Sequence, residues 1–364
     1  MTAIHQFLPT FAARDAIGMH CRRVQSLLRA AGFTSDIYAL EAHDDVEHQA
    51  LGVEEFAARR RGAHDDELAL YHFSIGSALA DELRDLRVPL ALDYHNITDA
   101  RYFLRWEPTA ASRMFEGRRQ LATLVDDTRF AIADSSFNES ELTDLGFSPT
   151  AVAPILIDFA DYDRAPDPAM LHARRRRRDE GGADWLFVGR IAPNKCQHDV
   201  IASFAAYRAV YDKEARLTLV GGQTAPRYAV ALRSMCRELG VDDAVTFTDV
   251  VAHPQLLACY RTADVFVSLS EHEGFNVPVL EAMHFDVPVV AYATCATPET
   301  VGDGGLLLSG KDPVLVATAV HEVLSDEPTR KQLIAAGRGR VDHFALDRTG
   351  PHFVDTVKRL LSCI

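Results

Sequence analysis

Ser268-Leu-Ser-Glu-His-Glu-Gly-Phe-Asn-Val-Pro-Val-Leu-Glu-Ala-Met283 is the stretch that decides the fold, and it begins where an apolar run ends. We expect a strand, a turn and a helix here, because Gly274 permits backbone conformations that other residues resist and Pro278 suits the first helical position. Glu273 lies on the turn and Glu281 farther along the helix, so both carboxylates are expected to face one cavity. Helix N-termini bind phosphate and sugar oxygens well. The spacing alone also fits an ordinary strand-to-helix connection with a solvated acidic turn.

A second stretch, Phe187-Val-Gly-Arg-Ile-Ala-Pro-Asn-Lys195, has a similar plan. A strand that begins at Trp185 leads into Gly189 and Arg190, and Lys195 lies near the start of the next helix. A planar guanidinium and a flexible ammonium that converge on one crevice suit a diphosphate. The alternative is that Arg190 and Lys195 are two surface cations near a turn, without a functional role.

Together the two stretches resemble the family 4 retaining glycosyltransferases, which have the GT-B fold. Residues 273–281 resemble the Glu-x7-Glu motif of that family, and residues 187–195 look like its Gly-Arg-x-x-x-x-Lys phosphate loop. The two occur in the family's order and separation. The resemblance is firm over residues 183–345 and looser before them. Residues 93–98 and 271–283 are similar in a general way to bacterial polysaccharide mannosyltransferases.

The resemblance implies a reaction. A hexosyl group, with mannosyl as the favoured sugar, would move from a nucleoside-diphosphate sugar to a hydroxyl of a saccharide or lipid-linked acceptor, with retention at the anomeric carbon. The setting would be the assembly of surface polysaccharide or another glycoconjugate. No metal and no other cofactor is expected, because two cations and a helix N-terminus can neutralise the leaving diphosphate.

The resemblance also implies a set of site residues. Glu273 would hold hydroxyls of the donor sugar, Glu281 would hold the ribose, and Arg190 with Lys195 would bind the diphosphate. Asn276 stands where many relatives carry glycine, which bears on the shape of the sugar pocket. The expected catalytic residues are His95, Arg190, Lys195 and Glu273, and the expected donor-binding residues are Gly18, Gly189, Arg190, Lys195, Glu273, Gly274, Phe275, Asn276, Val277 and Glu281.

The first half of the chain contributes further candidates. Gly18 precedes the first expected helix and is either a simple turn glycine or, by resemblance, a place where the backbone approaches the diphosphate. His95 follows a strand at its carboxyl end, where ligands bind in open α/β sheets, and in related enzymes a histidine here lies near the reacting centre. A lone histidine can equally be a satisfied structural group. An acceptor-side loop or an ordinary charged surface helix would account for Arg101, Tyr102, Arg105, Trp106, Arg118 and Arg119.

Short apolar runs alternate with helical stretches along the whole chain, which predicts βαβ units and a parallel sheet in each half. The expected strands are residues 4–8, 35–40, 68–73, 89–94 and 129–133, and then 185–188, 217–220, 245–248, 265–269, 288–292 and 306–308. The fold class is therefore α/β, and the GT-B resemblance implies two Rossmann-like doubly wound domains facing across a cleft.

We expect an acceptor-binding domain over residues 1–160 and a nucleotide-sugar-binding domain over residues 161–345. Residues 346–364 should hold a C-terminal helix, from Gly350 to Leu361, that crosses back to the first domain. A shift in composition over residues 155–183 predicts a linker and an exposed arm. The arginines at 174–178 within it would meet an anionic lipid or polymer, or form a solvated helix surface.

The composition excludes several classes of protein. A chain of 364 residues with 48% hydrophobic residues is long and apolar enough for two globular domains. The formal net charge of −14 argues against nonspecific binding of nucleic acid, although a local basic patch would allow peripheral contact with the inner face of a membrane. The six cysteines form no C-x-x-C pair, and neither a secretory signal nor an apolar run of the ~20 residues of a membrane span is evident. A cytoplasmic protein of undetermined oligomeric state is the expectation.

Two other functions compete with glycosyl transfer. A two-lobed protein that binds a sugar without chemistry would explain two α/β domains, but it does not explain Arg190 together with Lys195. The second alternative is another GT-B enzyme. A phosphorylase would need a pyridoxal lysine, and a nucleotide-sugar epimerase would convert the donor without an acceptor.

Overall fold

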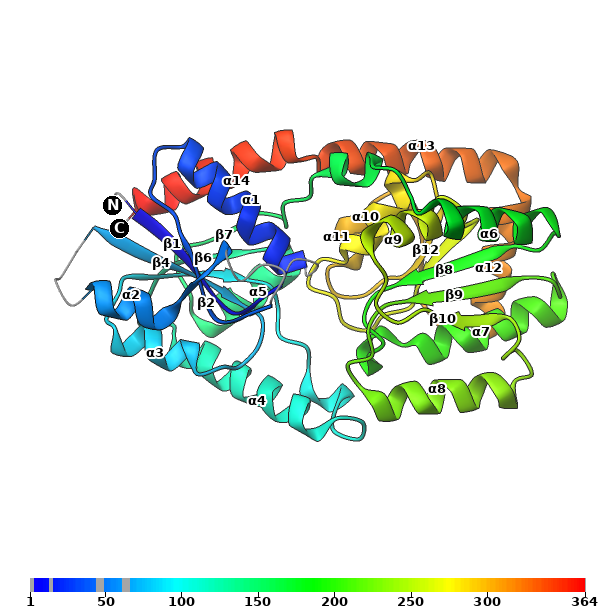
Figure 1. Ribbon diagram of the computed structural model, residues 1–364, viewed down its shortest axis with the longest axis horizontal. Helices are drawn as coiled ribbons and strands as arrows, with labels where there is room; N and C mark the ends of the chain where they lie inside the picture. The colour runs from blue at the N-terminus through cyan, green and yellow to red at the C-terminus, as the bar shows by residue number, and fades with distance from the viewer. Residues whose placement is uncertain (1–2, 13–15, 44–48, 61–65, 364) are drawn as a thin grey trace. The chain divides into compact units, whose positions relative to one another are not determined.

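The computed structural model describes residues 3–12, 16–43, 49–60 and 66–363, and the chain forms two compact units (Figure 1). Unit 1 comprises residues 1–100, 112–157 and 344–364, and unit 2 comprises residues 101–111 and 158–343. The chain thus changes unit after residues 100, 111, 157 and 343. Both units are mixed α/β structures with a parallel sheet, as the alternation of apolar runs and helical stretches predicts.

Unit 1 contains a seven-stranded sheet in the order β3-β2-β1-β4-β5-β6-β7, in which every paired strand is parallel. The strands are β1 (Ala3–Phe11), β2 (Ile37–Ala42), β3 (Leu51–Gly52), β4 (Glu67–Phe73), β5 (Leu90–Tyr94), β6 (Thr128–Ala133) and β7 (Thr150–Val152). The chain proceeds outward from β1 in both directions, which is the doubly wound arrangement. The short edge strands β3 and β7 were not predicted, because runs of two or three residues carry no periodic signal.

The helices of unit 1 cover both faces of its sheet (Figure 1). They are α1 (Ala16–Ala30), α2 (Val53–Arg60), α3 (Leu79–Asp85), α5 (Ser136–Leu145) and α14 (Leu346–Leu361), together with most of α4 (Pro108–Thr123). Residues 108–111 of α4 and residues 101–102 of the 3-10 turn η2 (Ala100–Tyr102) belong to unit 2. Helix α14 lies beside α1, and its Phe353, Val357 and Leu360 are buried against the apolar side chains of the central strands. The last helix therefore completes the core of the unit that contains the first strand. It begins at Leu346 rather than at Gly350, and Pro351 lies inside it.

Unit 2 contains a six-stranded parallel sheet in the order β10-β9-β8-β11-β12-β13. The strands are β8 (Asp184–Val188), β9 (Arg216–Val220), β10 (Val245–Phe247), β11 (Val265–Ser268), β12 (Val289–Tyr292) and β13 (Gly305–Leu308). The order reverses at β8, so β8 and β11 are neighbours although β9 and β10 lie between them in sequence. The carboxyl ends of β8 and β11 are the switch point at which doubly wound sheets bind ligands.

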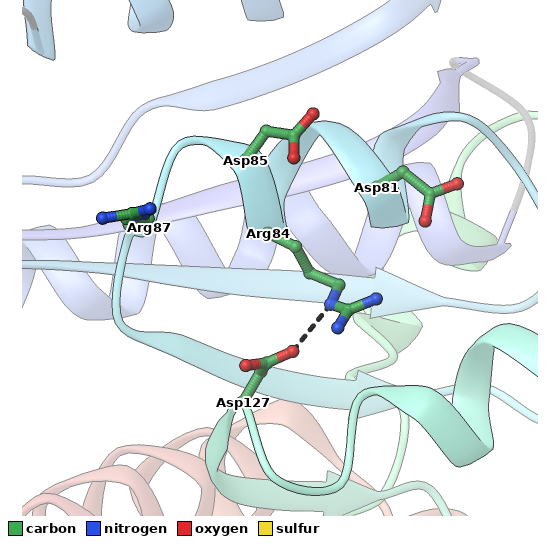
Figure 2. A pocket seen from close by; sticks show the side chains of 5 residues that line it. All are labelled: Asp81, Arg84, Asp85, Arg87 and Asp127. Atoms are coloured by element: carbon green, nitrogen blue, oxygen red, sulfur yellow. Dashed lines mark hydrogen bonds and ion pairs between the residues drawn. The ribbon is translucent and has the colours of Figure 1, made fainter.

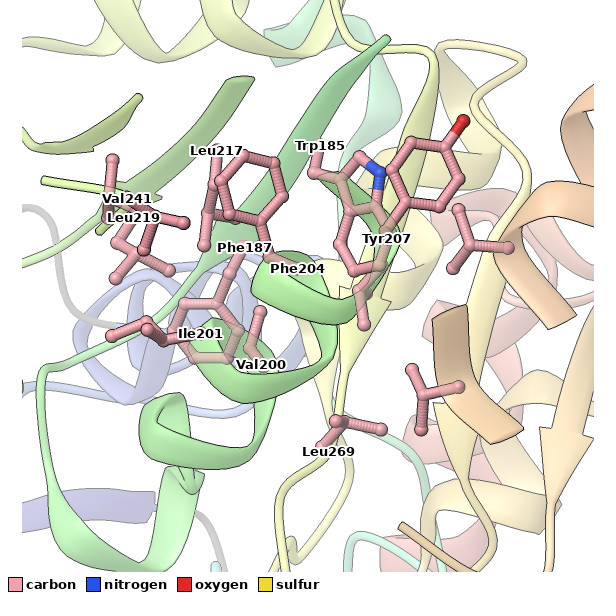
Figure 3. Close-up of a cluster of buried hydrophobic side chains, with 14 of the residues drawn as sticks. Trp185, Phe187, Val200, Ile201, Phe204, Tyr207, Leu217, Leu219, Val241 and Leu269 are labelled. Atoms are coloured by element: carbon pink, nitrogen blue, oxygen red, sulfur yellow. The ribbon is translucent and has the colours of Figure 1, made fainter. Parts of the chain in front are cut away.

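The helices of unit 2 are α6 (Pro168–Asp179), α7 (Gln197–Val210), α8 (Pro226–Glu238), α9 (His253–Tyr260), α10 (Val277–His284), α11 (Thr297–Val301), α12 (Pro313–Ser325) and α13 (Glu327–His343), with the 3-10 turns η3 (Phe159–Asp163) and η4 (Pro193–Lys195). Figure 3 shows the main core, where the aromatic side chains of Trp185 and Phe187 from β8 pack against Phe204 and Tyr207 of α7. This packing fixes the strand that leads into Gly189.

The arginine-rich segment forms helix α6, so the segment expected to be exposed is helical. No residue of α6 is buried, but two of its arginines fix it to the rest of unit 2. Arg174 donates to the hydroxyls of Thr262 at 2.6 Å and Thr218 at 3.1 Å, and Arg178 donates to Asp264 at 2.6 Å. The solvated-helix interpretation therefore describes the segment better. Among the described helices, none combines the length and apolarity that crossing a bilayer requires.

Candidate functional site

The two sequence motifs meet at the carboxyl ends of β8 and β11. Lys195, from the turn after β8, places its Nζ atom 2.7 Å from both carboxylate oxygens of Glu273, in the turn after β11. Only 17% of the Lys195 side chain and 7% of the Glu273 side chain are exposed. A shielded ion pair of this kind is stronger than one on an open surface. Four of the residues expected together, Gly189, Arg190, Lys195 and Glu273, thus lie on two adjacent loops.

Asn194 joins the same two loops through hydrogen bonds. Its carbonyl oxygen accepts from the Glu271 amide at 2.9 Å, and its side-chain Nδ2 donates to the His272 carbonyl at 3.2 Å. The Asn194 side chain is almost fully buried. Sequence reasoning did not single out this residue, which holds the Lys195 turn against the Glu273 turn.

Gly189 and Arg190 lie where the backbone is most crowded. Gly189 has φ 152°, and a Cβ atom on Gly221 of the adjacent loop would lie 2.1 Å from the Gly189 carbonyl oxygen. Glycine is therefore required where these two loops approach each other. The Arg190 side chain is exposed, and within the described residues its guanidinium has no hydrogen bond or ion pair. Its backbone carbonyl accepts from Gln197 Nε2 at 2.9 Å. An arginine held this way is available to an anion.

The start of α10 offers backbone N–H groups. Asn276 is its N-cap residue, with a left-handed backbone (φ 78°), and its side chain makes no capping hydrogen bond. Asn276 Nδ2 instead lies 3.4 Å from the hydroxyls of Ser268 and Thr297. Pro278 follows Val277 in the first turn, one position later than predicted. An uncapped helix N-terminus of this kind attracts oxygen atoms that carry negative charge.

The remaining donor-site candidates line the same turn. Gly274 and Phe275 lie between Glu273 and Asn276, and the Phe275 carbonyl accepts from the Thr300 hydroxyl at 2.5 Å. The Glu273 carbonyl accepts from the Ala296 amide at 3.3 Å. Helix α11 and the residue before it thus support the turn from the side of β12, and the Glu273 side chain is left to face Lys195.

Glu281 lies one turn into α10, where both of its carboxylate oxygens accept hydrogen bonds from tyrosines. Tyr162 Oη is 2.6 Å from Oε1, and Tyr260 Oη is 2.5 Å from Oε2. Burial raises the pKa of Glu281, while the two hydroxyl donors act in the opposite direction. A ribose hydroxyl would have to share or replace one of these tyrosines. This arrangement could not be predicted, because η3, which carries Tyr162, lies far from α10 along the chain.

A second lysine, Lys311, joins the Glu271–Glu273 turn to helix α7. Its Nζ atom lies 2.5 Å from Glu271 Oε1 and 2.5 Å from Asp199 Oδ2 in the first turn of α7. Burial opposes the charge of Lys311, but these two bonds raise its pKa above the ordinary value. The hydrogen bond from Lys311 in turn lowers the pKa of Glu271. No motif in the sequence marks Lys311.

Part of the expected acceptor-side loop belongs to unit 2 and lies beside this turn. Trp106 packs edge-on against Tyr228, with ring centroids 5.2 Å apart. The ring centroids of Tyr102 and His272 are 6.3 Å apart, and Arg101 Nη2 donates to the Tyr102 hydroxyl at 3.1 Å. By contrast, Arg118 and Arg119 belong to unit 1, where Arg118 bonds the Ile97 carbonyl and Glu141, and Arg119 pairs with Glu116. The structure does not gather these arginines into one loop.

His95 lies in unit 1 and is enclosed by side chains. Its Nδ1 atom is 3.0 Å from Asp134 Oδ2, and its Nε2 atom is 3.0 Å from His72 Nδ1. Only 1% of the His95 side chain is exposed. Burial holds the pKa of the neighbouring His72 well below its ordinary value. In this geometry neither ring nitrogen of His95 is left for a substrate, which favours the structural interpretation of this residue.

Gly18 also has a packing role. Helix α1 begins at Ala16, so Gly18 lies in its first turn and not before it, which corrects the expected helix boundary. A Cβ atom on Gly18 would lie 2.2 Å from the Ala12 carbonyl oxygen. The glycine therefore lets the backbone after β1 pass close to the helix.

A cavity of about 490 Å³ in unit 1 contains none of the expected site residues (Figure 2). Its lining is charged, and Arg84 Nε donates to Asp127 Oδ2 at 2.7 Å across it. The remaining lining residues are Asp81, Asp85 and Arg87. We assign no function to this solvated depression.

The sequence is similar to that of known glycosyltransferases. Residues 172–340 match the family model described as "Glycosyl transferases group 1". A D-inositol 3-phosphate glycosyltransferase from Corynebacterium efficiens is 29% identical over 306 residues, which cover 81% of this chain and 70% of the relative. A GDP-mannose-dependent alpha-(1-6)-phosphatidylinositol monomannoside mannosyltransferase from Mycobacterium tuberculosis is 33% identical over 232 residues, covering 61% of this chain and 59% of the relative.

Solved structures share the fold along nearly the whole chain. Sucrose-phosphate synthase from Thermosynechococcus elongatus matches with a TM-score of 0.78 and 19% identity, covering 100% of both chains. HepE from Anabaena, in complex with UDP-glucose, matches with a TM-score of 0.77 and 17% identity, covering 98% of this chain and 99% of the other. The family-model match over residues 172–340 and the curated relatives show that this chain is similar to the group 1 glycosyltransferases, and the solved structures show that it has the GT-B fold.

Proposed function

We propose that the protein transfers a hexosyl group, with mannosyl favoured, from a nucleoside-diphosphate sugar to a hydroxyl of a saccharide or lipid-linked acceptor, with retention at the anomeric carbon. The observation that carries the proposal is the Lys195–Glu273 pair beside the uncapped start of α10, together with the Arg190 guanidinium, which has no hydrogen bond or ion pair to any described residue. It joins two cations, a helix N-terminus and a carboxylate in one unit. These are the groups that a nucleotide sugar needs.

In this mechanism Arg190 and Lys195 bind the diphosphate, and the α10 N-terminus adds to the positive potential where the leaving charge develops. Glu273 accepts hydrogen bonds from hydroxyls of the donor sugar. No carboxylate is assigned as a covalent nucleophile, so the sugar leaves and is attacked on the same face, and the departing phosphate oxygen takes the acceptor proton. These charges need no metal at the diphosphate. His95 has no direct role in the proposal.

Glu281 is the proposed ribose contact, with Tyr162 moving aside to share its carboxylate. Unit 2 would then bind the donor and unit 1 the acceptor. The relatives named above act on an inositol phosphate and on a phosphatidylinositol mannoside, which supports an acceptor carrying a polyol or a lipid. A cytoplasmic enzyme that meets its acceptor at the inner membrane face fits that acceptor class.

The test combines binding with turnover. Thermal shifts are recorded with GDP-, UDP- and dTDP-sugars, because a ligand at 100 times its Kd stabilises a protein by ~2.7 kcal/mol. The donor with the largest shift is then incubated with saccharide and lipid-linked acceptors, and NMR of the anomeric proton reports the configuration of the product. Binding without turnover of any acceptor would favour a non-catalytic sugar-binding protein. Donor conversion without an acceptor would indicate an epimerase, and inversion would refute the mechanism.

A further inference from the structure

Helix α6 covers a pocket in unit 2 that neither sequence motif reaches. The pocket has a volume of about 240 Å³, and Arg174 and Arg177 line it from the helix. Thr218 of β9 and Thr246 of β10 line it from the sheet. These two threonines are register partners on adjacent parallel strands, so their side chains lie next to each other on one face of the sheet. We call this space the α6 pocket.

The α6 pocket lies at the edge of the sheet where the strands begin. Its lining also includes Asp184, the first residue of β8, and Arg216, the first residue of β9. Arg190 follows the opposite end of β8, and a strand of five residues is about 16 Å long. The pocket is therefore separate from the Lys195–Glu273 site at the carboxyl ends of the strands.

Arg174 brings a positive charge to the pocket without a counter-ion. Its Nε atom donates to the Thr262 hydroxyl at 2.6 Å and its Nη1 atom to the Thr218 hydroxyl at 3.1 Å, and both acceptors are neutral. Its Nη2 atom is buried and has no acceptor among the described residues. A shielded cation with an unused donor is costly. The site therefore lacks an acceptor that carries negative charge.

The other groups of the pocket are also donors. Arg177 is exposed, and its guanidinium bonds none of the described residues. The Thr218 oxygen accepts from Arg174, and its own hydrogen meets no acceptor in the described part of the chain. The Thr246 hydroxyl is exposed and makes no hydrogen bond to a described residue. Two guanidinium groups and two hydroxyls thus have hydrogens available, and a ligand that fits them must supply several acceptor oxygens.

The carboxylates near these donors do not supply the missing charge. Arg216 Nε donates to Asp184 Oδ1 at 2.9 Å, and Arg216 Nη2 lies 3.2 Å from Asp184 Oδ2. Asp243 Oδ1 accepts from Arg208 at 3.0 Å. Glu180 also lines the pocket, is exposed and pairs with no cation among the described residues. Two of the three lining carboxylates are therefore neutralised, and Glu180 opposes an anion only as a solvent-exposed charge.

We propose that the α6 pocket binds a phosphate group, with Arg174 and Arg177 as charged donors and the hydroxyls of Thr218 and Thr246 as neutral donors. A phosphate group presents three strong acceptor oxygens and a carboxylate two, so phosphate matches this set of donors better. Guanidinium groups also suit its geometry. The shielded Nη2 atom of Arg174 becomes accessible through a small shift of the side chains around it. The phosphate belongs to a soluble molecule or to a lipid headgroup, since both present the same oxygens.

The proposal does not depend on the proposed function, because the α6 pocket and the donor site share no residue. The first experiment titrates inorganic phosphate and glycerol 1-phosphate into the full-length chain by calorimetry, in a buffer without phosphate. It is repeated with Arg190→Ala, which weakens any phosphate binding at the Lys195–Glu273 site. We expect one phosphate per chain to bind in both proteins. Binding that disappears in Arg190→Ala would belong to the donor site and would count against the α6 pocket.

The second experiment locates the phosphate with neighbouring arginines, in the Arg190→Ala background. Arg177→Ala should weaken binding about 10-fold, whereas Arg176→Ala, which removes an exposed arginine of α6 that does not line the pocket, should change Kd less than about twofold. Glu180→Gln should strengthen binding about two- to fivefold, because it removes an opposing charge. Thr246→Val should weaken binding about threefold, and it tests the pocket from the sheet should Arg177→Ala fail to fold. Equal losses in the two arginine variants would show diffuse attraction to the helix and overturn the proposal.

The third experiment distinguishes a soluble ligand from a membrane. Vesicles of phosphatidylcholine, with and without phosphatidic acid, are sedimented with wild type, Arg176→Ala and Arg177→Ala. Binding of soluble phosphate without extra sedimentation on phosphatidic acid identifies a soluble ligand. Sedimentation that Arg177→Ala abolishes and Arg176→Ala preserves, without binding of soluble phosphate, identifies a lipid headgroup. If neither the soluble phosphates nor the vesicles show binding that depends on Arg177, the pocket is not a phosphate site.

Discussion

Lys195 Nζ lies 2.7 Å from both oxygens of Glu273, and this contact joins the loop after β8 to the loop after β11. We expect Lys195→Met to lower kcat/KM by about 10- to 100-fold, because a charge-assisted contact with the diphosphate contributes about 1.5–3 kcal/mol. Steady-state kinetics with the donor found by thermal shift measures the change.

The control is Lys213→Met, because the Lys213 side chain is 87% exposed and is paired at 3.9 Å with Glu214. It should retain wild-type kinetics. If Lys195→Met bound the donor as tightly as wild type in calorimetry, Lys195 would be a purely structural partner of Glu273.

Arg190→Ala tests the other cation. We expect kcat/KM to fall by about 10- to 100-fold, since the guanidinium would contribute a charged contact of similar strength. The Tm should change little, because Arg190 is exposed and bonds no side chain among the described residues. Arg237→Ala, which removes an exposed arginine that donates to the Ser234 hydroxyl, is the matched control. Kinetics unchanged by Arg190→Ala would exclude this residue from the site.

The raised pKa of Glu281 in the folded state predicts how the stability of the protein depends on pH. Burial raises its pKa in the folded state, so the folded chain holds this proton more tightly than the unfolded chain does. The stabilising contribution of Glu281 is therefore complete below the unfolded pKa and is lost as pH rises through the folded pKa. Glu281→Gln removes this term, so the variant should gain stability relative to wild type as pH rises from 4 to above the folded pKa. Urea denaturation of both chains at several pH values measures it.

An equal pH dependence of the two chains would contradict the raised pKa. Tyr260→Phe is the companion variant, because it keeps the ring and deletes one hydroxyl donor to Glu281. We expect it to lower the free energy of unfolding by about 1–3 kcal/mol, since the Oε2 atom of the buried carboxylate then loses its tyrosine donor while Oε1 keeps Tyr162.

Lys311→Met should destabilise unit 2. Removing the ammonium leaves Glu271 and Asp199 close together without the cation that lies 2.5 Å from each. Both carboxylates are partly exposed, so we expect a loss of about 1–2 kcal/mol and not the larger cost of a fully buried pair. The measurement is chemical denaturation, and Lys331→Met, which breaks an exposed pair with Glu327, should cost less than about 0.5 kcal/mol. Equal effects of the two variants would show that Lys311 has no special role.

Parallel topology explains how far the sequence could predict the site. Arg190, Lys195 and Glu273 follow strands that a doubly wound order makes adjacent, so their convergence could be predicted from the sequence. The tyrosine partners of Glu281 could not, since Tyr162 and Tyr260 come from a linker turn and another helix. Lys311 is a single lysine in a loop, and nothing local distinguishes it from a solvated one.

The same reasoning explains the differences in the fold. Buried strands with long apolar runs, such as β5 and β11, were predicted nearly to the residue. The arginine run formed a helix because Asp167 caps its N-terminus and Arg174 and Arg178 bond to distant residues, which composition alone cannot reveal. His95 looked like an isolated histidine in the sequence, while its partner His72 lies on β4 and its partner Asp134 directly follows β6.

The packing of α14 on the sheet of unit 1 has a consequence for synthesis of the chain. Phe353, Val357 and Leu360 belong to the core that also contains Ile4 and Leu68. The ribosome synthesises the chain from its amino end. The face of the unit 1 sheet that α14 covers therefore stays exposed while all of unit 2 is translated. Newly made protein should therefore depend on chaperones over this interval, and nascent chains stalled before residue 346 should be cut by protease within unit 1 more readily than the finished protein.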